Sequence, residues 1–216
     1  MKIIAHRGFW ISENEKNKKS SFIRAFDLGI GTETDLRDCA GKILISHDMP
    51  NGDEIILEDL LDIMNGRNLT LALNIKADGL ADEIKNILKK YNHTNYFTFD
   101  MSIPDMVYQI NKEMKIFTGL SDIVKSPILL EKVEGVWLDS FYSDWYEEDI
   151  IDRILEENKK VCIVSSDLHK RDTEKQWGII KKCKYFESDN LILCSDKVKE
   201  AFKYFLNISI ESKEIK

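Results

Sequence analysis

The chain has 216 residues, of which 43% are hydrophobic and 32% charged, and its net charge is -7 at pH 7. This length supports one sizeable core and is short for two, so we expect a single domain over residues 1–216. The acidic balance argues against a nucleic acid partner. No apolar run reaches the roughly 20 residues of a membrane span. His6 and Arg7 interrupt the apolar N-terminus, which therefore lacks a secretory signal, and we expect a cytoplasmic protein without an integral membrane segment.

Short β-rich runs alternate with amphipathic segments along most of the chain. Strands are expected at residues 2–6, 31–36, 42–47, 69–75, 95–100, 115–119, 135–139, 160–165 and 191–195. The second and third are separated by a turn at 38–41 and are expected to form a hairpin. Helices are expected after Ser20 or Ser21, and at 57–66, 79–91, 102–110, 146–158 and 197–206. About eight strand–helix units indicate a parallel sheet and fit a single (β/α)8 TIM barrel, an α/β fold.

The cysteines are scattered along the chain, at Cys39, Cys162, Cys183 and Cys194, and no two form a CxxC pair. This scatter argues against a zinc knuckle or a disulfide framework. Cys162 and Cys194 lie inside apolar runs, which indicates buried and inert thiols. The tail after Ile208 is expected to fray.

Polar residues stand at the carboxyl ends of the predicted strands, where the active site of a barrel lies. In chain order they are His6 with Arg7, Glu33 with Asp35, His47, Asn74 with Lys76, Asp100, Asp139, and Ser195 with Asp196. Residues two apart in a strand share a face, so Glu33 and Asp35 are expected to point the same way. The oxygen ligands Glu33, Asp35 and Asn74 suit Mg²⁺ or Ca²⁺ better than zinc. Two histidines, an arginine and two carboxylates around such a metal ion are the groups needed to cleave a phosphate ester.

The charged residues have structural alternatives. Glu33 and Asp35 are either metal ligands or a carboxylate pair held by Arg7 or Arg37. Lys76 either reaches the site or extends from a strand end towards solvent.

The more distant polar residues also have alternatives. Asp100 and Asp139 either line the pocket or cap the helices that follow them. Trp137 either walls the pocket or packs in the core. His169 follows a strand and is a candidate for substrate contact, whereas His93 lies in a polar loop and is interpreted as having no role in catalysis.

A specific motif covers residues 3–48: HRG after the first strand, then ETD, then SHD. In this order and spacing it resembles the glycerophosphodiester phosphodiesterase family. More broadly it is similar to the phosphatidylinositol-phospholipase-C-like barrels, which include the sphingomyelinase D toxins. The resemblance implies a barrel of the phospholipase-C-like phosphodiesterase type and metal-dependent hydrolysis of a small phosphodiester in lipid metabolism.

The resemblance also assigns roles to particular residues. It implies that His6 and His47 are the catalytic acid and base, without deciding which is which. It implies that Glu33 and Asp35 bind the metal, with Asn74 at the position of a third carboxylate. Arg7 and Lys76 would hold the phosphate oxygens.

The chain departs from the family pattern at three places. Asn74 replaces a carboxylate, Lys16 stands where a carboxylate is expected near the site, and no sizeable insertion domain follows His47. The loop that carries Lys16 has no obvious anchor in the sequence, so the position of this side chain stays open. These departures keep open a non-catalytic or weakly active barrel that binds a phosphorylated metabolite or lipid headgroup. A separate alternative is a phospholipase or lyase that forms a cyclic phosphate by intramolecular attack.

Overall fold

The computed structural model describes residues 1–210. Within this range the backbone contacts define two compact units. The N-terminal unit is Ala5–Ile116, and the C-terminal unit is Met1–Ile4 together with the chain from Phe117 onward. The single domain expected over residues 1–216 stays a prediction, and most of the tail expected to fray lies outside the described residues.

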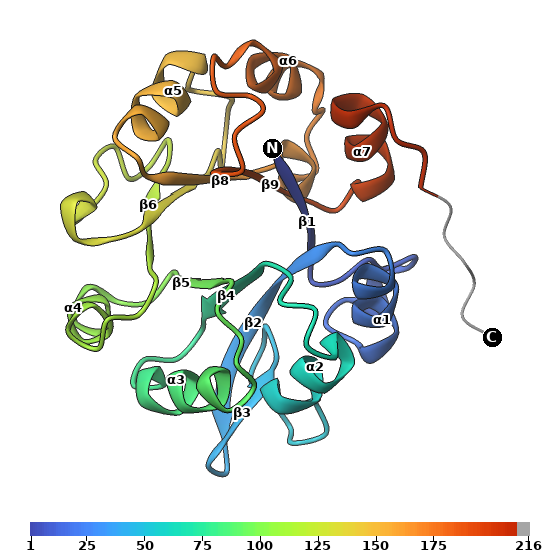
Figure 1. The fold of residues 1–216 in the computed structure, drawn as a ribbon, viewed down its shortest axis with the longest axis vertical. Coiled ribbons are helices and arrows are strands. Elements are labelled where there is room, and N and C mark those ends of the chain that lie inside the picture. The colour runs from blue at the N-terminus through green and yellow to red at the C-terminus, as the bar shows by residue number, and fades with distance from the viewer. Residues whose placement is uncertain (211–216) are drawn as a thin grey trace. The chain divides into compact units, whose positions relative to one another are not determined.

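Strands and helices alternate in the N-terminal unit, as Figure 1 shows. Its strands are β1 (Lys2–His6, which begins in the other unit), β2 (Gly31–Cys39), β3 (Lys42–Ile45), β4 (Leu71–Ile75) and β5 (Tyr96–Phe99). Its helices are the 3-10 helix η1 (Glu13–Glu15), α1 (Lys19–Asp27), α2 (Leu57–Met64), α3 (Ala81–Lys90) and α4 (Ile103–Asn111). β4 pairs in parallel with both β2 and β5, whereas β3 pairs with β2 in antiparallel fashion. The predicted hairpin of β2 and β3 is therefore confirmed.

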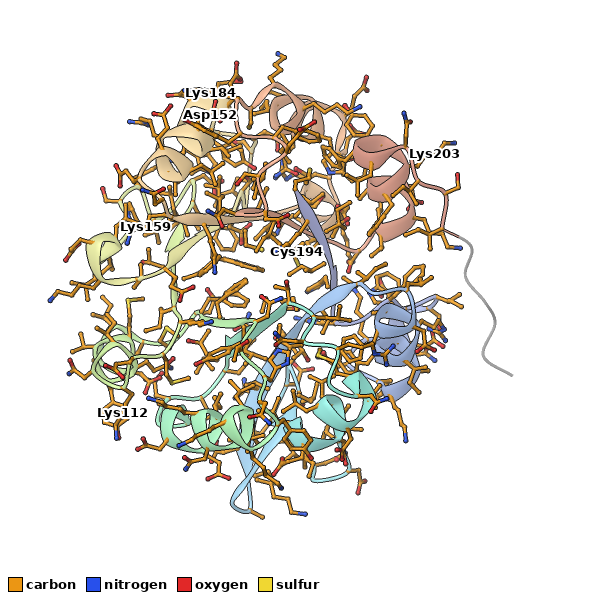
Figure 2. All side chains as sticks on the ribbon, in the orientation of Figure 1. Lys112, Asp152, Lys159, Lys184, Cys194 and Lys203 are labelled. Atoms are coloured by element: carbon orange, nitrogen blue, oxygen red, sulfur yellow. The ribbon has the colours of Figure 1, made fainter. Side chains whose placement is uncertain are left out.

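The C-terminal unit continues the alternation. Its strands are β6 (Phe117–Leu120), β7 (Gly135–Leu138), β8 (Lys160–Val164) and β9 (Leu191–Ser195), and successive strands pair in parallel. Its helices are η2 (Leu130–Lys132), α5 (Glu148–Glu156), η3 (Ser166–His169), α6 (Glu174–Lys182) and α7 (Val198–Leu206). Cys162 on β8 and Cys194 on β9 are fully buried, as predicted, and Figure 2 labels Cys194. The same view shows Lys184 at the periphery beside Asp152, whose carboxylate accepts the Lys184 backbone N–H at 3.1 Å.

The strand order of the sheet identifies the fold class. It runs β5-β4-β2-β1-β9-β8-β7-β6, with β3 attached to β2 outside this path. Thr98 of β5 also forms a parallel bridge with Ile116, directly before β6. Across residues 1–210, eight parallel strands thus follow one another in the sheet in the cyclic order of the chain, which is the topology of a (β/α)8 barrel. The predicted fold class is confirmed, and between His47 and α2 there is only a short loop in place of an insertion domain.

Two local predictions differ from the structure. The N-cap of α1 is Lys18 and not a serine, because the Ser21 hydroxyl donates to the Lys18 carbonyl from within the helix. Helix α6 was not predicted, since the buried amide of Gln176 interrupts its apolar pattern. That amide donates to the Tyr146 hydroxyl and to the Val164 carbonyl, partners that a sequence pattern does not reveal. Within residues 1–210 no helix is long and apolar enough to span a membrane.

Candidate active site

The turn after β1 is held against β2. Arg7 takes a left-handed conformation with φ 55°, and its backbone N–H donates to the Glu33 carbonyl at 3.0 Å. Gly8 follows with φ 84°, and its N–H donates to Oγ1 of Thr32 at 2.9 Å. A Cβ on Gly8 would lie 2.4 Å from Oγ of Ser21, so glycine is required here by both conformation and space. The HRG motif is thus a tight turn that brings the His6 and Arg7 side chains beside β2.

Three buried oxygen atoms on neighbouring strands share one face of the sheet. Glu33 and Asp35 alternate on β2, and Asn74 on β4 stands in register with Asp35. All three side chains are buried. Oε2 of Glu33, Oδ1 of Asp35 and Oδ1 of Asn74 have no hydrogen-bond partner within the described chain. We call these three atoms the oxygen triad.

Cations gather on Asp35. Nε of Arg7 lies 2.8 Å from Oδ2, an ion pair without hydrogen-bond alignment, and Nζ of Lys76 lies 3.5 Å from Oδ1. Lys76 therefore contacts the site and does not simply extend into solvent. Nε of Arg37 instead donates to the His47 carbonyl at 3.1 Å.

Glu33 is the most perturbed acid of the site. Burial raises the pKa of its carboxyl group well above the ordinary 4.5, and the neighbouring Asp35 carboxylate raises it further, against the opposing effect of Arg7 and Lys76. Nε2 of His6 lies 3.7 Å from Oε2 of Glu33. A cation bound at the oxygen triad would stabilise the ionised form of Glu33, which burial disfavours.

His47 returns to this edge of the sheet through the hairpin. The Ser46 N–H donates to the Asp35 carbonyl at 3.0 Å, so the end of β3 lies beside the middle of β2. Nδ1 of His47 lies 2.8 Å from Oδ1 of Asp48. The His47 side chain is 48% exposed, which leaves room for a substrate to meet the imidazole.

The donor set fits a hard divalent cation. Carboxylate and amide oxygens are the ligands that Mg²⁺ and Ca²⁺ prefer, and an unpartnered buried oxygen is costly without a ligand. Within residues 1–210 no group of three or more His, Cys, Asp or Glu side chains is arranged to hold a metal ion. The oxygen triad contains two carboxylates, and an amide supplies its third member.

The remaining candidates fall into two places. Asp100, directly after β5, accepts a hydrogen bond at Oδ2 from Nδ2 of Asn74 at 3.1 Å. In the C-terminal unit, Nε2 of His169 lies 2.7 Å from Oδ1 of Asp139, and the His169 ring packs 5.3 Å from that of Phe141. Trp137 is buried on β7. The structure thus joins Asp100 to Asn74 and joins Asp139 to His169.

His93, expected to have no catalytic role, is a buried loop residue. Nε2 of its ring lies 3.2 Å from the Asn95 carbonyl.

Sequence reasoning missed Asn17, a third residue that contacts Asp35 besides Arg7 and Lys76. Its Nδ2 donates to Oδ2 of Asp35 at 2.9 Å, and its Oδ1 accepts from the Thr34 hydroxyl at 2.9 Å. The available signal was its place in the segment Glu15–Lys18, which aligns with the family pattern after HRG.

The loop that carries Lys16 does have an anchor. Nη1 and Nη2 of Arg24 on α1 donate to the two carboxylate oxygens of Glu15 at 3.0 and 2.6 Å. Nζ of Lys16 lies 4.5 Å from the centroid of the Trp10 ring. The lysine at the family's carboxylate position therefore packs on an aromatic ring.

Comparison with known proteins gives structural matches without sequence matches. No protein-family model and no curated protein sequence matches the chain. A glycerophosphodiester phosphodiesterase from Agrobacterium tumefaciens is 15% identical with a TM-score of 0.65, over 96% of this chain and 100% of that one. An Oleispira antarctica phosphodiesterase, solved with its product sn-glycerol-3-phosphate, is 15% identical with a TM-score of 0.67. The match covers 94% of this chain and 96% of that one.

A third solved structure agrees with these two. A glycerophosphoryl diester phosphodiesterase from Parabacteroides distasonis is 13% identical with a TM-score of 0.67, over 99% of this chain and 88% of that one. At these identities the likeness establishes the fold. These three structures are phosphodiesterases of the kind that the HRG, ETD and SHD motif resembles.

Proposed function

We propose that this chain is a divalent-metal-dependent phosphodiesterase that cleaves a glycerophosphodiester into glycerol 3-phosphate and an alcohol. The observation that carries the proposal is the oxygen triad of Glu33, Asp35 and Asn74, with His6, Arg7 and Lys76 beside it. The structural likeness to phosphodiesterases, one of them solved with sn-glycerol-3-phosphate, supports this choice of substrate class.

The charges of the site suit a phosphodiester. A divalent cation held by the oxygen triad would neutralise charge on the phosphate oxygens as it develops in the transition state. Arg7 contacts Asp35 through Nε, so further donors of its five-donor guanidinium can hold phosphate. Lys76 provides a second positive charge on the opposite oxygen of Asp35. Asp35 thereby positions both phosphate-binding cations.

The two histidines exchange protons with the attacking and departing oxygens. Asp48 orients His47 through Nδ1, which directs Nε2 of the same ring away from that contact. His6 lies beside the oxygen triad, with its Nε2 3.7 Å from Oε2 of Glu33. A positioned acid or base of this kind contributes typically 10²- to 10⁴-fold to the rate.

The test is release of glycerol 3-phosphate from a panel of glycerophosphodiesters, with Mg²⁺ or Ca²⁺, with chelator, and with His47→Ala. Turnover that requires both the metal and His47 supports the proposal. The exposed position of His47 makes this variant a fair comparison, because removing the ring does not disturb the core. Saturable ligand binding without turnover from folded protein would show instead a barrel that only binds a phosphorylated compound. Accumulation of a cyclic phosphate would show the phospholipase or lyase reaction.

A further inference from the structure

We propose that Asp100 is a positioning residue of the metal site: it holds the Asn74 amide with its oxygen, and not its nitrogen, in the oxygen triad. This inference rests on the proposed function. It concerns this chain in particular, because a carboxylate has two equivalent oxygens and needs no such control, whereas an amide has only one oxygen that can bind a cation.

The contact itself sets the orientation. Nδ2 of Asn74 donates to Oδ2 of Asp100 at 3.1 Å, and Oδ1 of Asn74 is the buried atom without a partner. Rotating the amide by half a turn would place Oδ1 against Oδ2 of Asp100. Two acceptor oxygens would then meet without a hydrogen between them, and the two N–H groups of the amide would face the oxygen triad. An ionised Asp100 therefore excludes the orientation that could not bind a cation.

The backbone keeps the two side chains together. Asn74 on β4 pairs with Phe99 on β5, directly before Asp100. Asp100 adopts a left-handed conformation with φ 64°, which aspartate tolerates better than most residues and which turns the chain after the strand. The Ser102 N–H then donates to Oδ1 of Asp78 at 3.1 Å, which ties the segment after β5 to the segment after β4. Asp100 is thus fixed relative to Asn74 by strand pairing and by this loop contact.

The experiment compares Asp100→Gly with Asp100→Asn. Glycine and asparagine both tolerate φ 64°, so neither variant strains the backbone. Glycine removes the acceptor, whereas asparagine removes the charge and keeps an oxygen that can accept from Asn74. The measurement is calorimetric titration of the metal-free protein with Mg²⁺ and with Ca²⁺, in the absence of substrate.

We expect Asp100→Gly to weaken metal affinity about 10- to 100-fold, the usual effect of removing a partner of a metal ligand. Asp100→Asn should recover only part of that loss, because its amide can accept from Asn74 but can also donate to a reversed Asn74 amide. A matched control is Gln109→Leu, which breaks another buried amide–carboxylate hydrogen bond, from Nε2 of Gln109 to Oδ2 of Asp105 at 2.7 Å. This control should lower stability and leave metal affinity unchanged.

The proposal is overturned if Asp100→Gly binds the metal as tightly as wild type, or if Asp100→Asn binds it as weakly as Asp100→Gly. It is also overturned if the wild-type protein binds neither metal. These outcomes are separable from the proposed function, which is tested by turnover. Metal-dependent turnover with unchanged affinity in Asp100→Gly would refute the role of Asp100 alone. Weakened metal binding in a protein without turnover would refute the proposed reaction alone.

Discussion

Asn17 donates a hydrogen bond from Nδ2 to Oδ2 of Asp35 at 2.9 Å, across 18 residues of sequence. The same oxygen of Asp35 lies 2.8 Å from Nε of Arg7. One hydrogen bond and one ion pair therefore hold Oδ2, which leaves Oδ1 as the member of the oxygen triad. The loop after the HRG motif thus helps to decide which oxygen of Asp35 faces the candidate metal position.

Removing the Asn17 side chain should free Asp35 to rotate. Asn17→Gly suits the test, because this residue has φ 59° and glycine adopts that conformation without strain. We expect metal affinity to fall about tenfold or more, as for other groups that orient a metal ligand. Calorimetric titration with Mg²⁺ measures the change. The same substitution at Asn207, which has φ 58° at the end of α7, controls for the loss of an asparagine in this conformation and should leave metal affinity unchanged.

Replacing Glu33 with glutamine should stabilise the metal-free protein and abolish turnover. Burial and Asp35 raise the pKa of the Glu33 carboxyl group well above 4.5, so the folded chain binds this proton more tightly than the unfolded chain does. The wild-type protein therefore loses stability as the pH rises from about 4.5 through the raised pKa, and Glu33→Gln escapes that loss. We expect a gain of about 1 kcal/mol at neutral pH, typical of relieving a strained functional residue.

Urea unfolding in the presence of chelator, at pH 4.5 and at pH 7.5, checks this prediction for Glu33. The gain should be larger at pH 7.5. With saturating Mg²⁺ the wild type should become more stable than Glu33→Gln, because the metal stabilises only the protein that binds it. Equal stability of wild type and variant at pH 7.5 would mean that Glu33 carries no electrostatic cost.

The pair of Glu15 and Arg24 should give the opposite pH dependence. Hydrogen bonds from the Arg24 side chain, and to a smaller extent from the Ile11 backbone N–H, lower the pKa of Glu15 to about 2. The stability that Glu15 contributes is therefore present above its ordinary pKa of 4.5 and is lost as the pH falls towards 2. Glu15→Gln should cost about 1 kcal/mol at pH 7, as for a partly exposed ion pair.

Unfolding of Glu15→Gln and wild type at several pH values between 7 and 3 measures this loss. The difference between the two free energies of unfolding should be constant down to about pH 5 and should then narrow. A difference that grows on acidification would contradict the role assigned to the Glu15 carboxylate. Glu13→Gln, a change of the same kind in the same 3-10 helix, should have little effect.

A methyl group at Gly8 should distort the HRG turn. Its Cβ would lie 2.4 Å from Oγ of Ser21 and 2.9 Å from the Ser21 backbone carbon, at φ 84°. Gly8→Ala should therefore cost roughly 1–3 kcal/mol for overpacking, in addition to the strain of the backbone. Gly79→Ala is the matched control, since Gly79 has φ 87° and, apart from its chain neighbours, no heavy atom of residues 1–210 lies within 4 Å of its Cβ position. Thermal unfolding should show a larger loss of stability for Gly8→Ala than for Gly79→Ala. Similar losses of stability would mean that contact with Ser21 is unimportant.

The alternation of residues allowed much of the fold and the core of the site to be predicted. Strand β1 matches its predicted bounds, and β4, β5 and β7 differ from theirs by one or two residues. The period of two placed Glu33 and Asp35 on one face, because successive side chains of a strand point to opposite sides. The HRG turn and the ETD and SHD segments were also readable, since each is a local pattern with a definite place at a strand end.

The partners of these residues were decided by the tertiary structure. Asn17 meets Asp35, Asn74 meets Asp100 across 26 residues, and His169 meets Asp139 across 30. Helix α6 likewise depends on Gln176 finding partners on other elements. Local periodicity records which face a side chain occupies, but not which distant group meets it there. The sequence by itself therefore determined the strands, their order and the chemical groups at their ends, whereas strand register and loop contacts decided which oxygen of Asp35 and of Asn74 faces the candidate metal position.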